Sequence, residues 1–504
     1  MKKIAFAGTD GRTLLWAYVV STATSEHFED DFEGLVVRGT PSMPAFSKAM
    51  GWPVEFVPTQ SNDVDSYSQA IIAALEAGTI DCVVPMPEGL LFEGLVDRVE
   101  AAGFGDRILG LNKSAAFIEG DKIECKELCR DAGIPVSDAW VQVDAHDYDS
   151  VLKTSLEFIQ SFGGAVLKYP YSAGGKGARI ILNSWEIREV YDTLIKDYKD
   201  SYKKQFGKKK AWPLLIESLM SGVEISFTLF VDQKGSYQIL PTSMDYPERF
   251  EGPASKTNPI TGGTGAVSPH PMETPELIEM AGKTIAEPLV GIMRERNLLR
   301  PCILYPGCFV SFDASMRPVK IRVSEINIRP GEPEAQPVAR RLRNLGALVK
   351  ASLTNELDKV KPEVREDQVA ICIALMTGAG GPDGQKGYPW SCTKNEPIEF
   401  DLKYLKRKGI QVIPSAMTWV EDKDIFKSDG TRVAFLNANL TVKGNDSRGV
   451  LADRLRNKLL TAFDNGKFRV IPREDANGNR LALRRDIGVH YLKAEELFPG
   501  LHEI

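Results

Sequence analysis

The chain has 504 residues, of which 43% are hydrophobic and 26% are charged, and its formal net charge is −6 at pH 7. This composition is that of a globular protein with enough apolar residues for about three domains of roughly 150 residues each. The acidic balance provides no basic footprint, so we expect no nucleic-acid partner. No apolar run approaches the length of a membrane span, about 18 residues, and the apolar run at the start is too short for a signal peptide. We therefore expect a cytoplasmic protein with no membrane partner.

The first 110 residues alternate short apolar runs with helical patterns. The runs "KKIAFAG", "FEGLVVRG", "PVEFVPT" and "DCVVPMP" are separated by segments such as "SYSQAIIAALEAG". This rhythm predicts a doubly wound parallel sheet. The turn at residues 8–11 follows the first strand, where such folds bind phosphates at a helix N-terminus. Its glycine pattern is incomplete, and a plain strand-to-helix turn explains it equally well.

A glycine-rich loop follows in the next region, between strand-like runs at residues 165–168 and 178–182. It carries Gly174, Gly175 and Gly177 around Lys176. Backbone N–H groups of such a loop, with one lysine, can hold a triphosphate. A hairpin with an exposed lysine is the competing interpretation.

The stretch "SEINIRPGEPEAQP" continues a strand predicted from residue 318, in which apolar and polar residues alternate. At the same period Glu325, Asn327 and Arg329 are expected to continue the apolar face. A carboxylate and an amide oxygen two residues apart make half of a Mg²⁺ site, and the guanidinium can neutralise a phosphoryl group. A buried ion pair between Glu325 and Arg329 is the alternative. Together with the glycine-lysine loop, the pattern favours an ATP-dependent enzyme.

The last region, from about residue 356, carries strand-like segments such as "DQVAICIALMTG" and "TRVAFLNANLTVKG". These segments predict a separate small α+β domain.

Seven segments occur in the order in which a known family has them: "GDKIECKELCRDAGIPV", "LKYPYSAGGKG", "LLIESLMSGVEISF", "TGGTGAVSPHP", "LYPGCFV", "SEINIRPGEPEAQP" and "RRDIG". The chain thereby resembles glycinamide ribonucleotide synthetase (phosphoribosylamine–glycine ligase), of the ATP-grasp superfamily. The resemblance implies an α/β protein, α+β as a whole, in three domains. These are an N-terminal doubly wound pre-ATP-grasp domain at 1–110, an ATP-grasp domain at 111–355 with a mobile lid at about 124–190, and a C-terminal α+β domain at 356–504.

The resemblance also implies roles for the residues that hold ATP and metal. Arg329 and Lys168 are expected to be catalytic, and Glu325 and Asn327 to bind Mg²⁺ or Mn²⁺. The residues expected to bind ATP are Lys122, Lys168, Gly174, Gly175, Lys176, Gly177, Glu217, Leu219 and Glu224. Among them, the backbone at 217–219 is expected to meet adenine.

The substrate pocket implied by the resemblance departs from the family's motifs in several places. Its expected residues are Gly11, Arg12, Asp245, Thr261, Gly262, Gly263, Glu332, Pro333 and Glu334. The family's Gly-Gly-Arg-Glu-His loop is matched only at Gly11-Arg12, and its Asp-His-Lys-Arg stretch reads "DYPER" here. The expected reaction joins glycine to 5-phosphoribosylamine. Two alternatives stay open: a paralogous ligase for another carboxylate and another amine, and a non-catalytic nucleotide-binding or regulatory protein descended from the ligase. The expected partners are small molecules, and the chain is expected to be a monomer or a small homo-oligomer.

Overall fold

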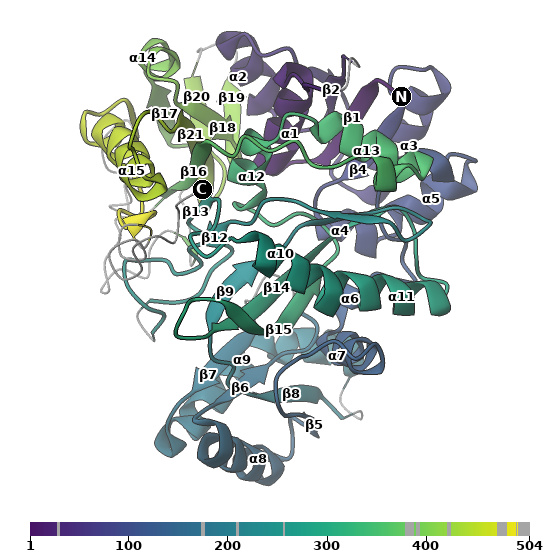
Figure 1. Ribbon diagram of the computed structural model, residues 1–504, viewed down its shortest axis with the longest axis vertical. Helices are drawn as coiled ribbons and strands as arrows, with labels where there is room; N and C mark the ends of the chain where they lie inside the picture. Colours follow the sequence, from purple (N-terminus) through teal and green to yellow (C-terminus); the bar gives the residue numbers. More distant parts are fainter. Residues whose placement is uncertain are drawn as a thin grey trace.

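The computed structural model describes residues 1–27, 31–172, 177–207, 211–255, 258–377, 388–389, 394–420, 425–470, 481–489 and 491. The N-terminal region and the C-terminal region lie side by side at the top of Figure 1, and a smaller unit with its own sheet lies at the bottom. Within the described ranges, no helix is both long enough and apolar enough to cross a membrane.

The N-terminal sheet is parallel and has the order β3-β2-β1-β4. Its strands are β1 (Lys3–Gly8), β2 (Glu33–Arg38), β3 (Glu55–Val57) and β4 (Cys82–Pro85). In β1, Ala5 and Ala7 pack in one hydrophobic cluster and Phe6 in another. Because successive side chains of a strand point to opposite faces, both faces of the sheet are covered. The doubly wound fold expected from the sequence is confirmed.

Five helices follow or connect the strands of this sheet. They are α1 (Gly11–Thr22), α2 (Ser42–Met50), α3 (Val64–Glu76), α4 (Glu88–Phe92) and α5 (Leu95–Ala101). Helix α1 begins directly after β1, and Asp10 caps it by accepting the Thr13 N–H at 3.2 Å. The sheet changes winding direction between β1 and β4, where doubly wound folds bind ligands.

The unit at the bottom of Figure 1 is an antiparallel sheet of order β5-β8-β6-β7 with two long helices. The elements that lead to this unit or form it are η1 (Gly105–Arg107), α6 (Phe117–Gly120), α7 (Lys122–Asp131), β5 (Trp140–Asp144), α8 (Tyr148–Phe162), β6 (Ala165–Lys168), β7 (Ala178–Ile181), η2 (Ser184–Glu186), α9 (Ile187–Phe206) and β8 (Pro213–Ser218). Leu167, Leu194 and Leu214 belong to a hydrophobic cluster confined to this unit. The unit therefore has a core of its own.

A second antiparallel sheet forms the centre of the molecule. It has the order β11-β10-β14-β15, with β9 also paired to β14. Its strands are β9 (Val223–Ser226), β10 (Leu229–Val231), β11 (Tyr237–Ile239), β14 (Cys302–Phe312) and β15 (Pro318–Asn327). The helical segments that follow or cover it are α10 (Pro275–Ala281), η3 (Gly282–Ala286), α11 (Glu287–Glu295), α12 (Ala335–Arg341), α13 (Leu345–Thr354) and η4 (Leu357–Lys359).

A bulge near the end of β15 decides which of its side chains face the core. Val323 pairs with Cys308 and Glu325 pairs with Gly307, so Ser324 is an extra residue in β15. An extra residue reverses the alternation of faces. The expectation that Glu325 continues the apolar face of Val323 is therefore wrong.

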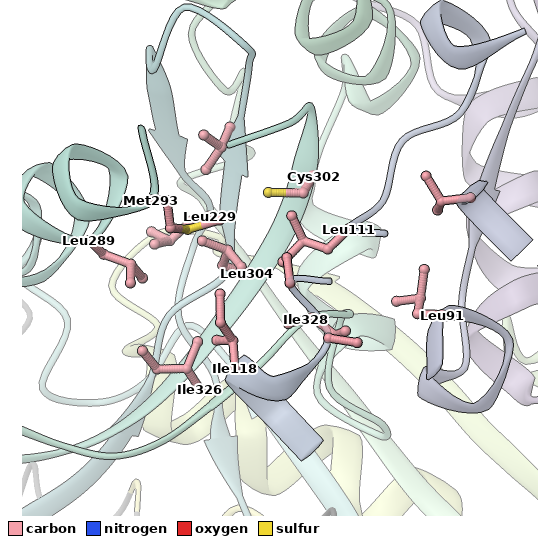
Figure 2. Packing of buried hydrophobic residues seen from close by; sticks show 14 of the residues in the cluster. Leu91, Leu111, Ile118, Leu229, Leu289, Met293, Cys302, Leu304, Ile326 and Ile328 are labelled. Carbon is pink, nitrogen blue, oxygen red and sulfur yellow. The ribbon is translucent and has the colours of Figure 1, made fainter. Parts of the chain in front are cut away.

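The core side of β15 after the bulge is carried by Ile326 and Ile328. Both are 1–2% exposed and belong to the cluster that also holds Leu304 and Met293. Figure 2 shows the two isoleucines among these apolar side chains, near Ile118 of α6. Asn327, between them, lies on the opposite face of the strand.

The C-terminal region shares a sheet with the central region. This sheet has the order β12-β13-β16-β21-β18, with β23 also paired to β16. Its strands are β12 (Met244–Asp245), β13 (Gly265–Ser268), β16 (Gln368–Thr377), β18 (Gln411–Pro414), β21 (Arg432–Thr441) and β23 (Leu481–Ala482). The remaining elements are β17 (Pro397–Phe400), α14 (Leu402–Arg407), β19 (Met417–Val420), β20 (Ile425–Ser428), α15 (Arg448–Asp464) and β22 (Phe468–Val470). Strand pairing thus crosses residue 355, where a domain boundary is predicted.

Candidate active site

Two lysines from different elements meet beside the carboxyl end of β15. Lys122 is the first residue of α7, whose N-terminus is capped by the Asp121 side chain. Its Nζ donates to the Ser172 carbonyl oxygen at 2.5 Å and lies 3.4 Å from Glu325 Oε2. Lys168 is the last residue of β6 and is 7% exposed. Cations in this position can bind phosphate groups.

Glu217 of β8 lies between two lysines. Its Oε1 is 3.0 Å from Lys168 Nζ, and its Oε2 is 3.1 Å from Nζ of Lys126, one turn beyond Lys122 on α7. Burial raises the pKa of the Glu217 carboxyl, but Lys126 and Lys168 outweigh it, and the net shift is downward. The carboxylate is therefore ionised and buried between two cations.

Glu325 and Asn327 place two side-chain oxygens, both possible metal ligands, on the face of β15 that lies away from the core. Asn327 Nδ2 donates to the Tyr305 carbonyl oxygen at 3.4 Å and to Glu325 Oε1 at 3.5 Å. Burial raises the pKa of the Glu325 carboxyl, but Lys122 and Lys168 lower it by more. The carboxylate is therefore ionised.

These donors fit a magnesium ion. The described part of the chain holds no group of three or more His, Cys, Asp or Glu side chains that could enclose a metal. Mg²⁺ is typically bound by one or two side-chain oxygens and completes its shell with water and substrate phosphates. Glu325 and Asn327 fit this incomplete donor set.

Arg329 is held by two carboxylates from other elements, not by Glu325. Its Nε lies 3.1 Å from Glu88 Oε2, and its Nη2 lies 3.3 Å from Glu119 Oε1. The second oxygen of Glu119 accepts the Ile328 N–H at 2.8 Å. Burial lowers the pKa of Arg329, but Glu119 and Glu88 raise it by more. The guanidinium is therefore charged and fixed in direction. The alternative of a Glu325–Arg329 ion pair is wrong.

Three further carboxylates lie beyond the metal donors. Glu224 comes from β9, Asp245 from β12, and Glu334 from the turn after β15. The side chain of Glu224 is partly open to solvent, but neighbouring protein atoms displace some of its water, and this effect together with repulsion by Glu325 raises the pKa of Glu224 to about 7. Burial and repulsion by Glu334 raise the pKa of Asp245 well above its usual value. These groups can accept hydrogen bonds from hydroxyl or ammonium groups.

At the N-terminus of α1, the groups expected to bind phosphate already have protein partners. The Arg12 N–H donates to Glu332 Oε1 at 3.0 Å. The Arg12 guanidinium, on a side chain 5% exposed, donates to Asp10 Oδ2 at 2.9 Å and to the Pro330 carbonyl oxygen. Burial and repulsion by Asp10 raise the pKa of Glu332 to about 7.

The predicted substrate glycines pack against the turn that follows β15. Gly263 has φ +91°, and a Cβ at this position would lie 2.3 Å from Pro333 Cδ. Thr261 Oγ1 donates to the Pro247 carbonyl oxygen at 2.8 Å. Arg432 of β21 donates to the Gly262 and Gly263 carbonyl oxygens. The C-terminal region thus contributes to this end of the site.

The expected ATP-binding loop lies largely outside the described residues, which exclude Gly174, Gly175 and Lys176. Gly177 is described, and a Cβ on it would lie 2.0 Å from Ser172 Oγ. The Leu219 N–H, part of the segment expected at adenine, donates to the Gly164 carbonyl oxygen at 3.1 Å.

Sequence reasoning missed four charged residues of the site, namely Glu88, Glu119, Lys126 and Arg432. Lys126 lies in α7, one turn after Lys122. Its spacing of four from Lys122 was the available signal, because residues four apart share a helix face.

The combination of a lysine pair, a β15 oxygen pair and the surrounding sheets defines an ATP-grasp protein. A family model described as "Phosphoribosylglycinamide synthetase, ATP-grasp (A) domain" matches residues 120–335. The phosphoribosylamine–glycine ligase of Agrobacterium fabrum is 30% identical over 366 residues, which are 72% of this chain and 78% of the relative. The chain belongs to the phosphoribosylamine–glycine ligase family. The resemblance expected from the sequence is confirmed.

Other relatives extend the match along the chain. The phosphoribosylamine–glycine ligase of Chlorobaculum tepidum is 28% identical and covers 86% of this chain and 92% of its own length. The crystal structure of the Thermotoga maritima ligase has a TM-score of 0.66 at 19% identity, covering 96% of this chain and all of that one. A biotin carboxylase domain from Hydrogenobacter thermophilus, solved with MgADP, has a TM-score of 0.61 at 15% identity, covering 99% and 95%. The structural matches confirm the expected fold class.

Proposed function

We propose that this protein is an ATP-dependent ligase that joins glycine to 5-phosphoribosylamine, giving glycinamide ribonucleotide, ADP and phosphate. This is a reaction of purine biosynthesis. Membership of the phosphoribosylamine–glycine ligase family supports the assignment. The observation that carries it in this chain is the joint presence of Lys122, Lys168, Glu325, Asn327 and Arg329 around one pocket-facing strand end.

The proposed chemistry has two steps. The carboxylate of glycine attacks the γ-phosphoryl group of ATP, forming glycyl phosphate and releasing ADP. The amine of the acceptor then attacks the carbonyl carbon, the bond to phosphate breaks, and the amine loses a proton. Side chains need only position the reactants and offset charge, so no side-chain nucleophile is required.

Each site residue takes a role in this proposal. Lys122 and Lys168 hold ATP phosphates, and Arg329, fixed by Glu88 and Glu119, offsets charge on the transferring phosphoryl group. Glu325 and Asn327 would hold Mg²⁺, or Mn²⁺ in its place. When bound, the metal supplies positive charge to the phosphate oxygens.

The remaining assignments are proposals as well. The glycine-rich loop would close over ATP as part of a lid at about 124–190, and the backbone at 217–219 would meet adenine, with Glu224 beside the nucleotide. The residues proposed to form the acceptor pocket are Gly11, Arg12, Asp245, Thr261, Gly262, Gly263, Glu332, Pro333 and Glu334.

A second candidate is a paralogous ligase that joins another carboxylate to another amine. The α1 N-terminus favours it, because the Arg12 N–H and guanidinium are bonded to Glu332, Asp10 and Pro330. A phosphate would have to displace carboxylates there. The same acyl-phosphate chemistry would serve both candidates.

One experiment separates the two. The purified protein receives ATP, Mg²⁺, freshly generated phosphoribosylamine and either glycine or one member of a panel of amino acids. Mass spectrometry measures the amide product and a coupled assay measures ADP. Glycinamide ribonucleotide formed with glycine supports the first candidate. ADP without this product, or faster turnover with another carboxylate, supports the paralogous ligase.

A further inference from the structure

Lys126 is a buried lysine whose contacts in the structure are to Glu217 and Ser137. Its side chain is 4% exposed, and its Nζ lies 3.1 Å from Glu217 Oε2 and 3.3 Å from Ser137 Oγ. Lys122, one turn earlier on α7, instead contacts the Ser172 carbonyl oxygen and Glu325. The two lysines therefore have different anionic partners.

Charge neutrality does not require Lys126. One lysine is enough to balance the Glu217 carboxylate, and Lys168 already lies 3.0 Å from its other oxygen. A buried ammonium group costs several kcal/mol of hydration, which a second ion pair to the same carboxylate repays only in part. Burial accordingly lowers the pKa of Lys126, although Glu217 opposes the shift. The second cation needs a reason other than stability.

We look for that reason in nucleotide binding, during which Lys168 would exchange its contact with Glu217 for a contact with phosphate. In the structure, Lys168 Nζ lies 3.0 Å from Glu217 Oε1. To bind a phosphate, Lys168 must weaken this contact. Without Lys126, Glu217, whose side chain is 1% exposed, would then be a buried carboxylate without a counter-ion. Leaving a buried carboxylate without a counter-ion is strongly unfavourable, and this cost would be subtracted from phosphate binding.

We propose that Lys126 is a positioning residue that keeps Glu217 neutralised, so that Lys168 can exchange this carboxylate for a phosphate of the bound nucleotide. The inference rests on the proposed function only in taking an adenine nucleotide as the ligand. Lys126 does not touch the nucleotide. It acts through Glu217.

The test compares four variants by calorimetric titration with MgADP. Lys126→Met leaves Glu217 with one counter-ion, so Lys168 is retained by the carboxylate, and the dissociation constant should rise about tenfold or more. Glu217→Gln removes the competing charge and should bind MgADP at least as tightly as the wild-type protein. The double variant Lys126→Met/Glu217→Gln should recover binding to within about threefold of Glu217→Gln. Lys283→Met is the matched control, since this exposed lysine pairs with Glu279 away from the site.

The outcome for the double variant decides the question. A merely structural ion pair predicts that the double variant binds no better than Lys126→Met. That result, or unchanged binding by Lys126→Met, would overturn the inference. If Lys126→Met does not fold, as judged by thermal unfolding, Glu217→Gln and the double variant still test it. Weaker MgADP binding by a folded Glu217→Gln overturns it.

The same titrations separate this inference from the proposed function. Wild-type protein that binds no MgADP contradicts the proposed function itself. Wild-type binding with no difference among the variants contradicts the role of Lys126 alone.

Discussion

Replacing Glu325 by glutamine is expected to abolish Mg²⁺-dependent turnover without weakening metal-free nucleotide binding. Glutamine keeps the shape of the side chain but removes the only carboxylate of the proposed metal pair. Loss of this charge should lower kcat/KM by at least about 100-fold, roughly 2.7 kcal/mol in the barrier. The same change frees Lys122, whose Nζ lies 3.4 Å from Glu325 Oε2.

The distance between Lys122 and Glu325 sets how strongly the carboxylate holds the lysine. At 3.4 Å and an effective dielectric constant of about 20, the Lys122–Glu325 attraction is about 5 kcal/mol. Water offsets most of it, because the Glu325 side chain is 26% exposed. Even a small remainder makes Lys122 more available to a phosphate once the carboxylate is gone. ADP binding in EDTA should therefore be unchanged or tighter.

Two measurements on the same preparation test this reasoning. Turnover is followed against Mg²⁺ concentration, and ADP binding is titrated calorimetrically in EDTA. Glu279→Gln serves as the control, because Glu279 belongs to an exposed ion pair with Lys283. Activity of Glu325→Gln within about tenfold of wild type would refute the metal assignment. Weaker ADP binding in EDTA would refute the proposed competition for Lys122.

Glu119→Gln should lower kcat by about tenfold with nearly unchanged ATP affinity, because Arg329 loses a carboxylate at 3.3 Å that fixes its direction; steady-state kinetics with equal kcat would contradict this. Glu332→Gln should flatten the pH dependence of the free energy of unfolding. Burial raises the pKa of Glu332 from 4.5 to about 7, so its contribution to stability is complete below about pH 4.5 and is lost as the pH rises through about 7. Urea unfolding between pH 5 and 7 should show a slope smaller by up to about 1.4 kcal/mol per pH unit, and an unchanged slope counts against the shift. Gly263→Ala should lower the melting temperature and raise KM for the amine acceptor, because its Cβ would meet a proline ring at 2.3 Å. Gly78→Ala, also at positive φ but with nothing within 4 Å, measures backbone strain alone, and equal effects of the two would exclude the clash.

Local periodicity was sufficient to predict the N-terminal doubly wound sheet. The alternation of strands and helices in the first 110 residues became the doubly wound sheet, because side-chain faces are fixed by neighbouring residues. The strand ending at Asn327 was also predicted. Its bulge at Ser324 was not, since the bulge is set by pairing with β14, which lies earlier in the chain.

The charged partners of the site show where sequence reasoning stops. Glu325, Asn327 and Arg329 attracted attention because polar residues interrupted a predicted strand. Glu119 and Lys126 did not, because single charges in a helical pattern usually face water. Their burial depends on β8 and on the turn after β15, and only the folded structure brings these segments together.

The pairing of β13 with β16 has a consequence for how the chain is made. Strand β13 ends at Ser268, but its partner begins only at Gln368. At 5–20 residues per second, a ribosome needs roughly 5–20 s to supply the missing strand. During this interval the nascent chain carries the segment "GAVS", which is buried in the folded protein, with one strand edge unpaired. We therefore expect this stage of synthesis, more than the completed N-terminal sheet, to depend on protection by chaperones.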